Sequence, residues 1–300
     1  MRKKQSILVS TENGGLGNRL KSWVSVMRMT DQALVYWETN NSMPANFSEL
    51  FTNECEVKAL SKEMATHKSW LLSILPEDEK LLPYMFSAVC SPTHPLIRGI
   101  GKAYWRLSKK NDDKYRYMIF PKTHSKKMVR PDARHIDMEY ERIPLYFKEL
   151  YSKLFQKIQV NEVIKNISDS WSRENIEENT VGIQIRTWRD YPYRHNKYYK
   201  PSIKRLIKLI EKEANCKFLV VSDNDEVVDF LISMFGKDRI LSFPRKTSRS
   251  DSWNSISGIK EDLIDMLILS KTNKIFASYL STFSECAWWI GGAKATVTVF

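Results

Sequence analysis

The second half of the chain alternates short apolar runs with longer segments of helical spacing. We predict strands at Val181–Arg186, Phe218–Ser222, Ile240–Leu241 and Lys274–Ala277. The helices predicted between them are Ser202–Ala214, Asp225–Phe235 and Lys260–Leu269. Strands that alternate with helices of this length indicate a parallel sheet with helices on both faces. This region is therefore predicted to be a doubly wound α/β domain.

The first half begins with the same kind of unit and then becomes irregular. Ile7–Val9 predicts a short strand, Thr11–Asn18 a glycine-rich turn, and Arg19–Ala33 a helix. The later patterns predict a strand at Ala33–Trp37 and mainly helical segments at Asn46–Asn53, Lys62–Leu75 and Ile143–Trp171. The simplest architecture is two α/β units, with residues 1–165 as a first domain with helical insertions and residues 166–300 as a Rossmann-like second domain.

The chain is strongly basic, with 47 Lys and Arg against 35 Asp and Glu and a net charge of +12. This balance favours anionic partners such as nucleotides, nucleic acid, acidic glycans or a phospholipid surface. The four cysteines are scattered without a C-x-x-C pair and the five histidines stand singly, so we expect free thiols and no zinc site. Free thiols fit a reducing, cytoplasmic location, and no apolar run is long enough to predict a membrane span.

Polar residues follow three of the predicted strands. Arg186 ends the first, Ser222 and Asp223 end the second, and the turn Ser278–Ser284 follows the last. Because the carboxyl ends of parallel strands meet at one edge of a sheet, these residues should lie beside one crevice. An arginine fork suits a phosphate, Asp223 can accept two hydrogen bonds from a base edge, and Ser281 precedes a helix whose amino terminus favours an anion.

Each of these residues also has a structural alternative. Arg186 can belong to an ion pair, Asp223 can be the N-cap of the next helix, and Ser281 can cap the helix that follows it. The basic loop Phe243–Ser257 likewise has two interpretations: it orders over a bound anion, or it is a solvated loop. The residues alone leave these alternatives open.

Four short segments follow one another along the chain in a characteristic order: Gly14–Arg19, Gly182–Arg186, Val220–Asp223 and Leu280–Phe283. No single segment is specific, but their order and spacing resemble the GDP-fucose-dependent fucosyltransferase superfamily. That group includes the nodulation and core α-1,6-fucosyltransferases and the protein O-fucosyltransferases. The resemblance covers nearly the whole chain, although Pro44–Asp137 shows no motif.

The resemblance implies a GT-B fold of two Rossmann-like domains, in which the first holds mainly the acceptor and the second mainly the nucleotide sugar. In the family pattern Arg186 clasps the donor diphosphate and Asp223 binds guanine. Gln184 departs from the pattern, because many relatives have histidine there, and this leaves another nucleotide sugar as an alternative donor. The donor-binding residues implied by the resemblance are Gly15, Gly17, Asn18, Arg19, Gln184, Arg186, Ser222, Asp223, Ser281, Thr282 and Phe283.

Breaking the bond between a sugar and a nucleoside diphosphate builds negative charge on the leaving group and oxocarbenium character on the ring. We expect Arg186 to meet that charge in place of a metal ion, because no D-x-D pair stands at a persuasive strand end. The nearest is Asp223-Asn224-Asp225. No cofactor is expected beyond GDP-fucose as the donor substrate. Inversion also needs a base, for which Asp190 and Glu12 are the candidates.

The predicted activity is metal-independent transfer of L-fucose from GDP-fucose to a glycan hydroxyl. The expected partners are therefore a nucleotide sugar and a glycan acceptor, without nucleic acid. The rival interpretation is a non-catalytic nucleic-acid or polyanion-binding protein. It is supported by the net charge and by the segment Arg189–Lys200, which interleaves basic residues with tyrosines.

Overall fold

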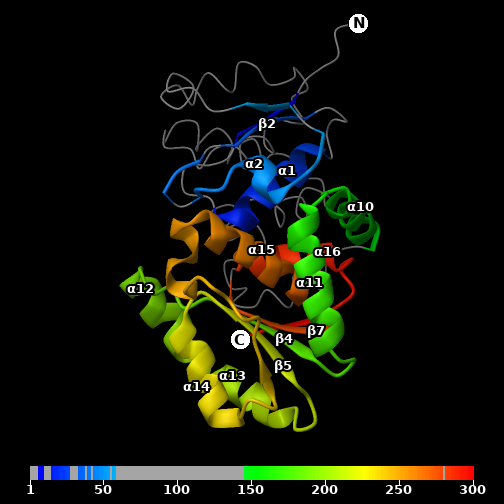
Figure 1. The fold of residues 1–300 in the computed structure, drawn as a ribbon. Coiled ribbons are helices and arrows are strands. Elements are labelled where there is room, and N and C mark those ends of the chain that lie inside the picture. Colours follow the sequence, from blue (N-terminus) through cyan, green and yellow to red (C-terminus); the bar gives the residue numbers. More distant parts are fainter. Residues whose placement is uncertain are drawn as a thin grey trace, which may run out of the picture.

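The computed structural model describes residues 6–9, 15–27, 33–37, 39–41, 43–54, 56–58, 145–279 and 281–300 of the chain. These residues form a mixed α/β structure with a larger and a smaller parallel sheet (Figure 1). The predicted helix Lys62–Leu75, the candidate base Glu12, and the motif residues Gly14 and Leu280 lie outside the described residues. Among the described helices, none is both long enough and apolar enough to cross a membrane.

The larger sheet has five parallel strands in the order β6-β5-β4-β7-β8. Their bounds are β4 Val181–Ile185, β5 Phe218–Ser222, β6 Ile240–Leu241, β7 Lys274–Ala277 and β8 Thr296–Val299. The first four confirm the predicted strands, although β4 ends before Arg186. β8 is absent from the predicted strands, although its alternation of threonine with valine is typical of an edge strand that is only partly buried.

Helices cover both faces of the larger sheet, as a doubly wound arrangement requires. On one face lie α13 (Lys200–Lys212) and α14 (Asp225–Phe235). On the other lie α15 (Ile256–Leu269) and α16 (Thr282–Ile290). α14 has its predicted bounds, whereas α13 and α15 begin earlier than predicted.

Strand residues point alternately to the two faces, so their parity along the chain decides which helices they meet. Phe218 and Val220 of β5 belong to the core beneath α13 and α14. Leu219 and Val221 belong to the core beneath α15 and α16. Both faces of the strand are therefore apolar, which explains why its sequence is continuously hydrophobic rather than alternating.

Gly182 shows how closely β4 approaches α15. A Cβ at this position would lie 2.5 Å from Leu269 Cδ1 and 2.6 Å from Thr272 Oγ1, so only glycine fits. Gln184 and Arg186 share the parity of Gly182, and their side chains therefore start from the same face of the sheet. The site residues of β4 are thus directed to the α15 side.

The smaller sheet has three parallel strands in the order β1-β2-β3, with bounds Ser6–Val9, Ala33–Tyr36 and Glu56–Lys58. Helix α1 (Leu16–Met27) follows β1 in the chain, so the predicted strand and the predicted helix are confirmed in that order, whereas most of the predicted turn between them lies outside the described residues. The helix starts before Arg19, because the glycine turn already provides its first residues.

The remaining helical predictions are confirmed only in part. Asn46–Asn53 contains just the short helix α2 (Phe47–Leu50). Ile143–Trp171 contains parts of two helices, α10 (Leu145–Gln156) and α11 (Glu162–Asn175). The break between them ends at Asn161, whose side chain caps α11 by accepting from Val163 N–H at 3.0 Å.

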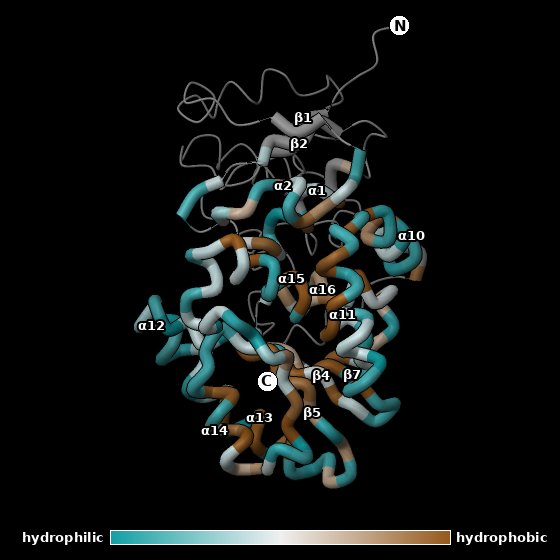
Figure 2. The backbone as a smooth tube through the Cα atoms, viewed as in Figure 1, coloured by the Kyte–Doolittle hydropathy of each residue, from teal (hydrophilic) through white to brown (hydrophobic). Residues whose placement is uncertain are grey.

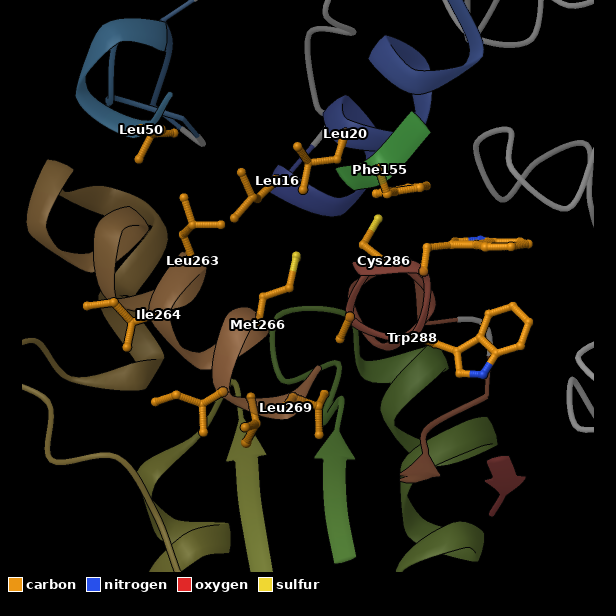
Figure 3. Close-up of a cluster of buried hydrophobic side chains, with 14 of the residues drawn as sticks. Leu16, Leu20, Leu50, Phe155, Leu263, Ile264, Met266, Leu269, Cys286 and Trp288 are labelled. Carbon is orange, nitrogen blue, oxygen red and sulfur yellow. The ribbon is translucent and has the colours of Figure 1, made fainter. Parts of the chain in front are cut away.

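One buried core joins helices from both halves of the chain, and Figure 3 shows its centre. Leu16 and Leu20 of α1 belong to the same cluster as Leu263 of α15. Figure 2 shows apolar residues along β4, β5, α15 and α16, at the centre of the larger unit. The division of the chain at residue 165 stays a prediction, since one core spans both sides of that point.

A buried ion pair also ties α1 to α16. Lys21 Nζ lies 2.6 Å from Glu285 Oε2, and the lysine side chain is only 1% exposed. Leaving a buried charge without its partner is energetically unfavourable, so this ion pair fixes the register between the two helices. The chain segment that enters α1 is thereby held beside the start of α16.

Candidate functional site

A cavity of ≈ 360 Å³ lies at the carboxyl ends of β4 and β5. The strand order reverses here, because the chain runs from β4 through β5 to β6 and then returns to β7 on the other side of β4. Ligands of open α/β sheets bind in the crevice at such a switch point. The predicted site residues on its wall are Gly15, Gly17, Asn18, Gln184, Arg186, Asp190, Ser222, Asp223, Ser281, Thr282 and Phe283.

Arg186 and Asp223 form an ion pair beyond the ends of their strands. Arg186 Nη1 lies 2.9 Å from Asp223 Oδ2, and Thr187 N–H donates to Asp223 Oδ1 at 2.8 Å. The ion-pair alternative for Arg186 is thus realised, yet its side chain is 40% exposed and lines the cavity. The N-cap alternative for Asp223 is wrong, because the Asn224 side chain caps α14 by accepting from Glu226 N–H at 3.0 Å.

The segment after β4 stacks arginines on aromatic rings. The Arg186 guanidinium carbon lies 5.3 Å from the Trp188 ring centre, and that of Arg194 lies 4.9 Å from the same ring. Arg194 is also 5.3 Å from the ring of Tyr191, which precedes the short helix α12 (Pro192–Arg194). These contacts lead from the strand end to α12, which Figure 1 shows at the edge of the molecule.

Trp188 holds an unusual backbone conformation within this stack. Its φ is 57°, in the left-handed region, and the residue is 5% exposed. A bulky side chain adopts this conformation only where its surroundings over-determine it. The strained turn therefore marks a place where packing, rather than local preference, positions the residues beside Arg186.

The first turn of α16 meets α1 at the cavity. Ser281 is the N-cap of α16 and accepts from Ser284 N–H at 3.3 Å, so its alternative as a cap is confirmed. A Cβ on Gly17 would lie 2.8 Å from the Thr282 carbonyl oxygen, and Cys286 Sγ donates to Gly17 O at 3.3 Å. The partial positive charge at a helix amino terminus favours an anion in the adjoining space.

Two buried amide oxygens on the cavity wall have no hydrogen-bond partner among the described residues: Gln184 Oε1 and Asn18 Oδ1. A buried polar atom left in this state costs about 1–3 kcal/mol. Hydroxyl or amino groups of a bound molecule would satisfy both oxygens. The two side chains thus suit a ligand that carries hydrogen-bond donors.

A second arginine cluster borders the cavity. Arg245 is 2% exposed, and its Nη1 lies 2.8 Å from Asp262 Oδ1 and 2.9 Å from Asp265 Oδ2. Its Nη2 donates to Gly258 O at 3.1 Å. Burial raises the pKa of Asp265 to about 6, although Arg245 opposes the rise. Asp265 Oδ1 has no hydrogen-bond partner among the described residues, and both aspartates line the cavity.

The sequence pattern does not single out this cluster, but it carries a signal for it. Asp265 interrupts the otherwise apolar run Leu263–Leu269, and Glu261 and Asp262 directly precede that run. Acidic residues are seldom buried unless they are paired, so acids within an apolar helix indicate a buried cation nearby. That the cation is Arg245 depends on how the preceding loop folds back, which the spacing does not reveal.

The arginines of the basic loop Phe243–Ser257 bind other parts of the protein and hold the loop in place, instead of pointing into solvent. Arg249 is 7% exposed, and its Nη1 lies 2.9 Å from Asp225 Oδ1. Although burial raises the pKa of Asp225, hydrogen bonds from Ser248 and Arg249 bring it below its usual value. The solvated interpretation is therefore wrong for both Arg245 and Arg249, which instead lie on the cavity wall.

Asp190, the candidate base that the structure describes, stands at the mouth of the cavity. Its side chain is 54% exposed, and Oδ1 lies 3.2 Å from Arg189 Nε. An exposed carboxylate in this place is accessible to an incoming hydroxyl group. Among the described residues, no group of three or more His, Cys, Asp or Glu side chains is arranged to hold a metal ion.

Arg19 is the one predicted site residue in the described ranges that does not lie on the cavity wall. It is 2% exposed, and its guanidinium carbon lies 4.7 Å from the ring centre of Trp37. The structure therefore places Arg19 in the core of the first half. Its neighbour Asn18 reaches the cavity instead, because successive residues of a helix point in different directions.

No protein-family model matches the chain, and no curated protein matches its sequence. Solved structures do match. NodZ α-1,6-fucosyltransferase soaked with GDP-fucose aligns with a TM-score of 0.52 at 14% identity, over 96% of this chain and 93% of that chain. A mutant of Arabidopsis thaliana FUT1 in complex with GDP gives 0.53 at 16% identity, over 99% and 70%. POFUT1 in complex with GDP-fucose gives 0.50 at 10% identity, over 99% and 98%.

These likenesses extend over almost the whole chain, including both sheets. At such low identity they establish the fold and leave the activity to be argued from the site. The resemblance inferred from the sequence motifs is confirmed at that level: the chain has the fold of these fucosyltransferases.

Proposed function

We propose that this protein is an inverting, metal-independent glycosyltransferase of GT-B architecture that transfers L-fucose from GDP-fucose to a glycan hydroxyl. The observation that carries the proposal is the meeting of Arg186 and the amino terminus of α16 at one switch-point cavity. Support for the donor comes from the compared NodZ and POFUT1 structures, which were soaked with or are in complex with GDP-fucose.

Arg186 and the first turn of α16 are the groups that neutralise the departing diphosphate. Arg186 is half-exposed, and a guanidinium can donate to two phosphate oxygens at once. Thr282 and Phe283, the first two residues of α16, line the same wall, where the amino terminus of the helix presents backbone N–H groups. Because this charge is arranged before the reaction begins, it favours the transition state over the bound donor.

Two carboxylates on the wall are candidates to bind guanine. The motif resemblance assigns this role to Asp223, which already accepts from Arg186 and Thr187. Asp265 is buried deeper and keeps one oxygen without a partner among the described residues. A carboxylate that accepts from the N1–H and amino groups of guanine discriminates against uracil, which lacks that pair of donors.

Asp190 is proposed as the base. Its carboxylate takes the proton of the acceptor hydroxyl while that oxygen bonds to the anomeric carbon of fucose. The bond from this carbon to the diphosphate breaks, and its electron pair leaves with GDP. Attack on the face opposite the leaving group inverts the anomeric centre. Glu12 keeps the same role as an alternative in the first half of the chain.

The cysteines support the proposed cellular location. Cys216 and Cys286 are free, which supports the reducing, cytoplasmic location predicted from the scattered cysteines. The proposed partners are the nucleotide sugar and a glycan acceptor. The proposal includes no cofactor, since Arg186 and the helix terminus supply the positive charge that the leaving group needs.

A thermal-shift panel with GDP, UDP, GDP-fucose and GDP-mannose tests the donor. GDP should raise the melting temperature strongly and UDP weakly, because at equal concentration the ligand that binds the folded state more tightly stabilises it more. Equal shifts with GDP and UDP would refute the guanine assignment. A larger shift with GDP-mannose than with GDP-fucose would indicate that mannose is the sugar transferred and that the protein is still a glycosyltransferase. This is the alternative left open by Gln184.

A further inference from the structure

Two exposed aromatic rings stand at the mouth of the cavity and take no part in donor binding as proposed. Tyr191 is 54% exposed and Trp253 is 40% exposed, and both line the cavity together with Asp190. They come from separate segments: Tyr191 precedes α12, whereas Trp253 lies in the 3-10 helix η3 (Arg249–Asn254). Exposed rings beside a polar cavity mark a place where another molecule is held.

One backbone carbonyl positions both segments. Ser250 O accepts from Arg189 Nη2 at 3.0 Å and from Trp253 Nε1 at 3.2 Å. Arg189 also pairs with Asp190, with 3.2 Å between Nε and Oδ1. The tryptophan ring and the candidate base are therefore linked through Arg189 and Ser250. Rings held in this way lose little conformational freedom when they bind a ligand.

Tyr191 is held from its other side. The Arg194 guanidinium carbon lies 5.3 Å from its ring and 4.9 Å from the buried ring of Trp188. Trp188 in turn contacts Arg186, the proposed diphosphate ligand, at 5.3 Å. The exposed ring is thus connected by packing to the place where the donor is proposed to bind.

We propose that Tyr191 and Trp253 form an acceptor subsite, on which a neutral sugar ring of the acceptor packs beside Asp190. The inference rests on the proposed function and adds the residues that select its acceptor. The face of an aromatic ring carries partial negative charge, and the C–H bonds on one face of a pyranose carry partial positive charge. The hydroxyl groups at the sugar's edge then reach the Asp190 carboxylate.

The carboxylate at the mouth suits the hydroxyl groups of a sugar. Asp190 is 54% exposed, lines the cavity together with the two rings, and is paired with Arg189, whose Nε lies 3.2 Å from Oδ1. The hydroxyl groups of a neutral glycan can donate to this carboxylate. Figure 2 shows that the residues of α12, which follow Tyr191 in the chain, are hydrophilic.

The test compares Trp253→Ala and Tyr191→Ala with the matched control Tyr193→Ala. Tyr193 is 70% exposed in the neighbouring helix α12 but does not line the cavity. Fucose transfer from labelled GDP-fucose to a printed array of neutral glycans is measured at limiting acceptor density. Each cavity variant should transfer about tenfold less label, as expected for the loss of one stacked ring, and Tyr193→Ala should match the wild type.

Further variants and readouts separate the possible results. Trp253→Phe should keep most of the transfer, because it retains an aromatic face, although the ring is smaller and the N–H group is lost. GDP-induced thermal shifts of all variants confirm that they fold and bind the nucleotide. Wild-type transfer by Trp253→Ala and Tyr191→Ala overturns the subsite and leaves the proposed function standing. A wild-type protein that shifts with GDP but labels no glycan overturns both.

A thymidine oligonucleotide serves as the opposing probe. If the wild type binds it and Trp253→Ala abolishes that binding, the rings stack on bases and the sugar subsite is overturned. Absence of oligonucleotide binding, together with the tenfold losses on the array, supports the proposal.

Discussion

Arg186 and Arg245 both pair with aspartates beside the same cavity, but their surroundings differ. The Arg186 side chain is 40% exposed and meets Asp223 at the strand ends. The Arg245 side chain is 2% exposed and meets Asp262 and Asp265 on α15. The first pair lies in contact with solvent, whereas the second is enclosed between a loop and a helix.

This difference separates a binding role from a structural one. Solvent screens an exposed ion pair, so its partners exchange at little cost and the arginine can turn to a phosphate. Breaking a buried pair leaves a stranded charge, which is strongly unfavourable. Arg245 therefore holds the loop Phe243–Ser257 on α15, and Arg186 remains available to a ligand.

The largest effect should come from Arg245→Met. Removing this cation leaves the buried Asp265 and the partly buried Asp262 without their partner, and the loss should be about 3–5 kcal/mol in the free energy of unfolding. Urea denaturation followed by circular dichroism measures it. Arg186→Ala is the matched control and should lose under about 1 kcal/mol, because its ion pair is exposed. Equal losses in the two variants would remove the distinction between the clusters.

The next effect concerns turnover. Arg186→Ala should lower kcat by about 10²–10³, the usual result of removing one group that stabilises developing negative charge. Arg186→Lys should restore only part of the rate, since an ammonium cannot hold two phosphate oxygens in a fixed fork. GDP release from GDP-fucose with a glycan acceptor measures both variants. Near-normal turnover by folded Arg186→Ala would return this arginine to a structural role.

The contrast also shows what the sequence could predict. Arg186 follows an apolar run, so strand-end logic places it at a crevice without knowledge of the rest of the fold. The same logic finds Asp223 and Ser281. It works because a parallel sheet brings its carboxyl ends together whatever the details of packing.

Reasoning from strand ends does not predict the cluster of Arg245 and its aspartates, and the reason is physical. Their contact joins a loop to the middle of a helix, and neither position is an end of a strand. Arg19 is the opposite case: the motif resemblance implies a place at the donor, which stays a prediction, whereas the structure places its guanidinium beside the ring of Trp37 and away from the cavity wall. Long-range packing decided both cases.

Asp190→Asn should lower turnover by about 10²-fold while leaving GDP affinity nearly unchanged, because a base acts on the acceptor hydroxyl and not on the nucleotide. The steady-state rate and the GDP-induced thermal shift are measured side by side. Glu12→Gln is the comparison variant. If Glu12→Gln alone loses activity, the base belongs to the first half of the chain and Asp190 serves only the mouth of the cavity.

A smaller effect distinguishes the carboxylates of the two clusters. We expect Asp265→Asn to weaken GDP binding about tenfold and to leave UDP binding nearly unchanged, because Asp265 Oδ1 has no partner among the described residues. Asp223→Asn should reduce the preference for GDP over UDP less than Asp265→Asn does, since both Asp223 oxygens already accept hydrogen bonds. The opposite ranking, by titration calorimetry, would assign guanine to Asp223, as the motif resemblance predicts.

The pH dependence offers an independent check. Burial raises the pKa of Asp265 to about 6, so the carboxylate is ionised above that pH and protonated below it. As the pH falls through 6 the carboxyl group loses its negative charge and one of its two acceptor oxygens becomes a donor, so wild-type GDP affinity should fall toward that of Asp265→Asn. The phosphate groups of GDP titrate equally in both proteins, so the difference between the two curves isolates the side chain. Parallel curves would exclude Asp265 from guanine binding.

The smallest expected effect is that of chelation, because transfer should persist in excess EDTA. The carboxylates nearest a D-x-D pattern are already engaged: Asp225 Oδ1 lies 2.9 Å from Arg249 Nη1, and Asp225 Oδ2 accepts from Ser248 Oγ at 2.7 Å. Asp223 is held by Arg186 and Thr187. A metal ion would have to displace these donors before it could reach a diphosphate. GDP release is followed before and after chelation, and again with Mg²⁺ or Mn²⁺ restored. Activity that vanishes with EDTA and returns with either ion would identify Asp223 and Asp225 as metal ligands. Arg186 would then serve only as the ion-pair partner of Asp223.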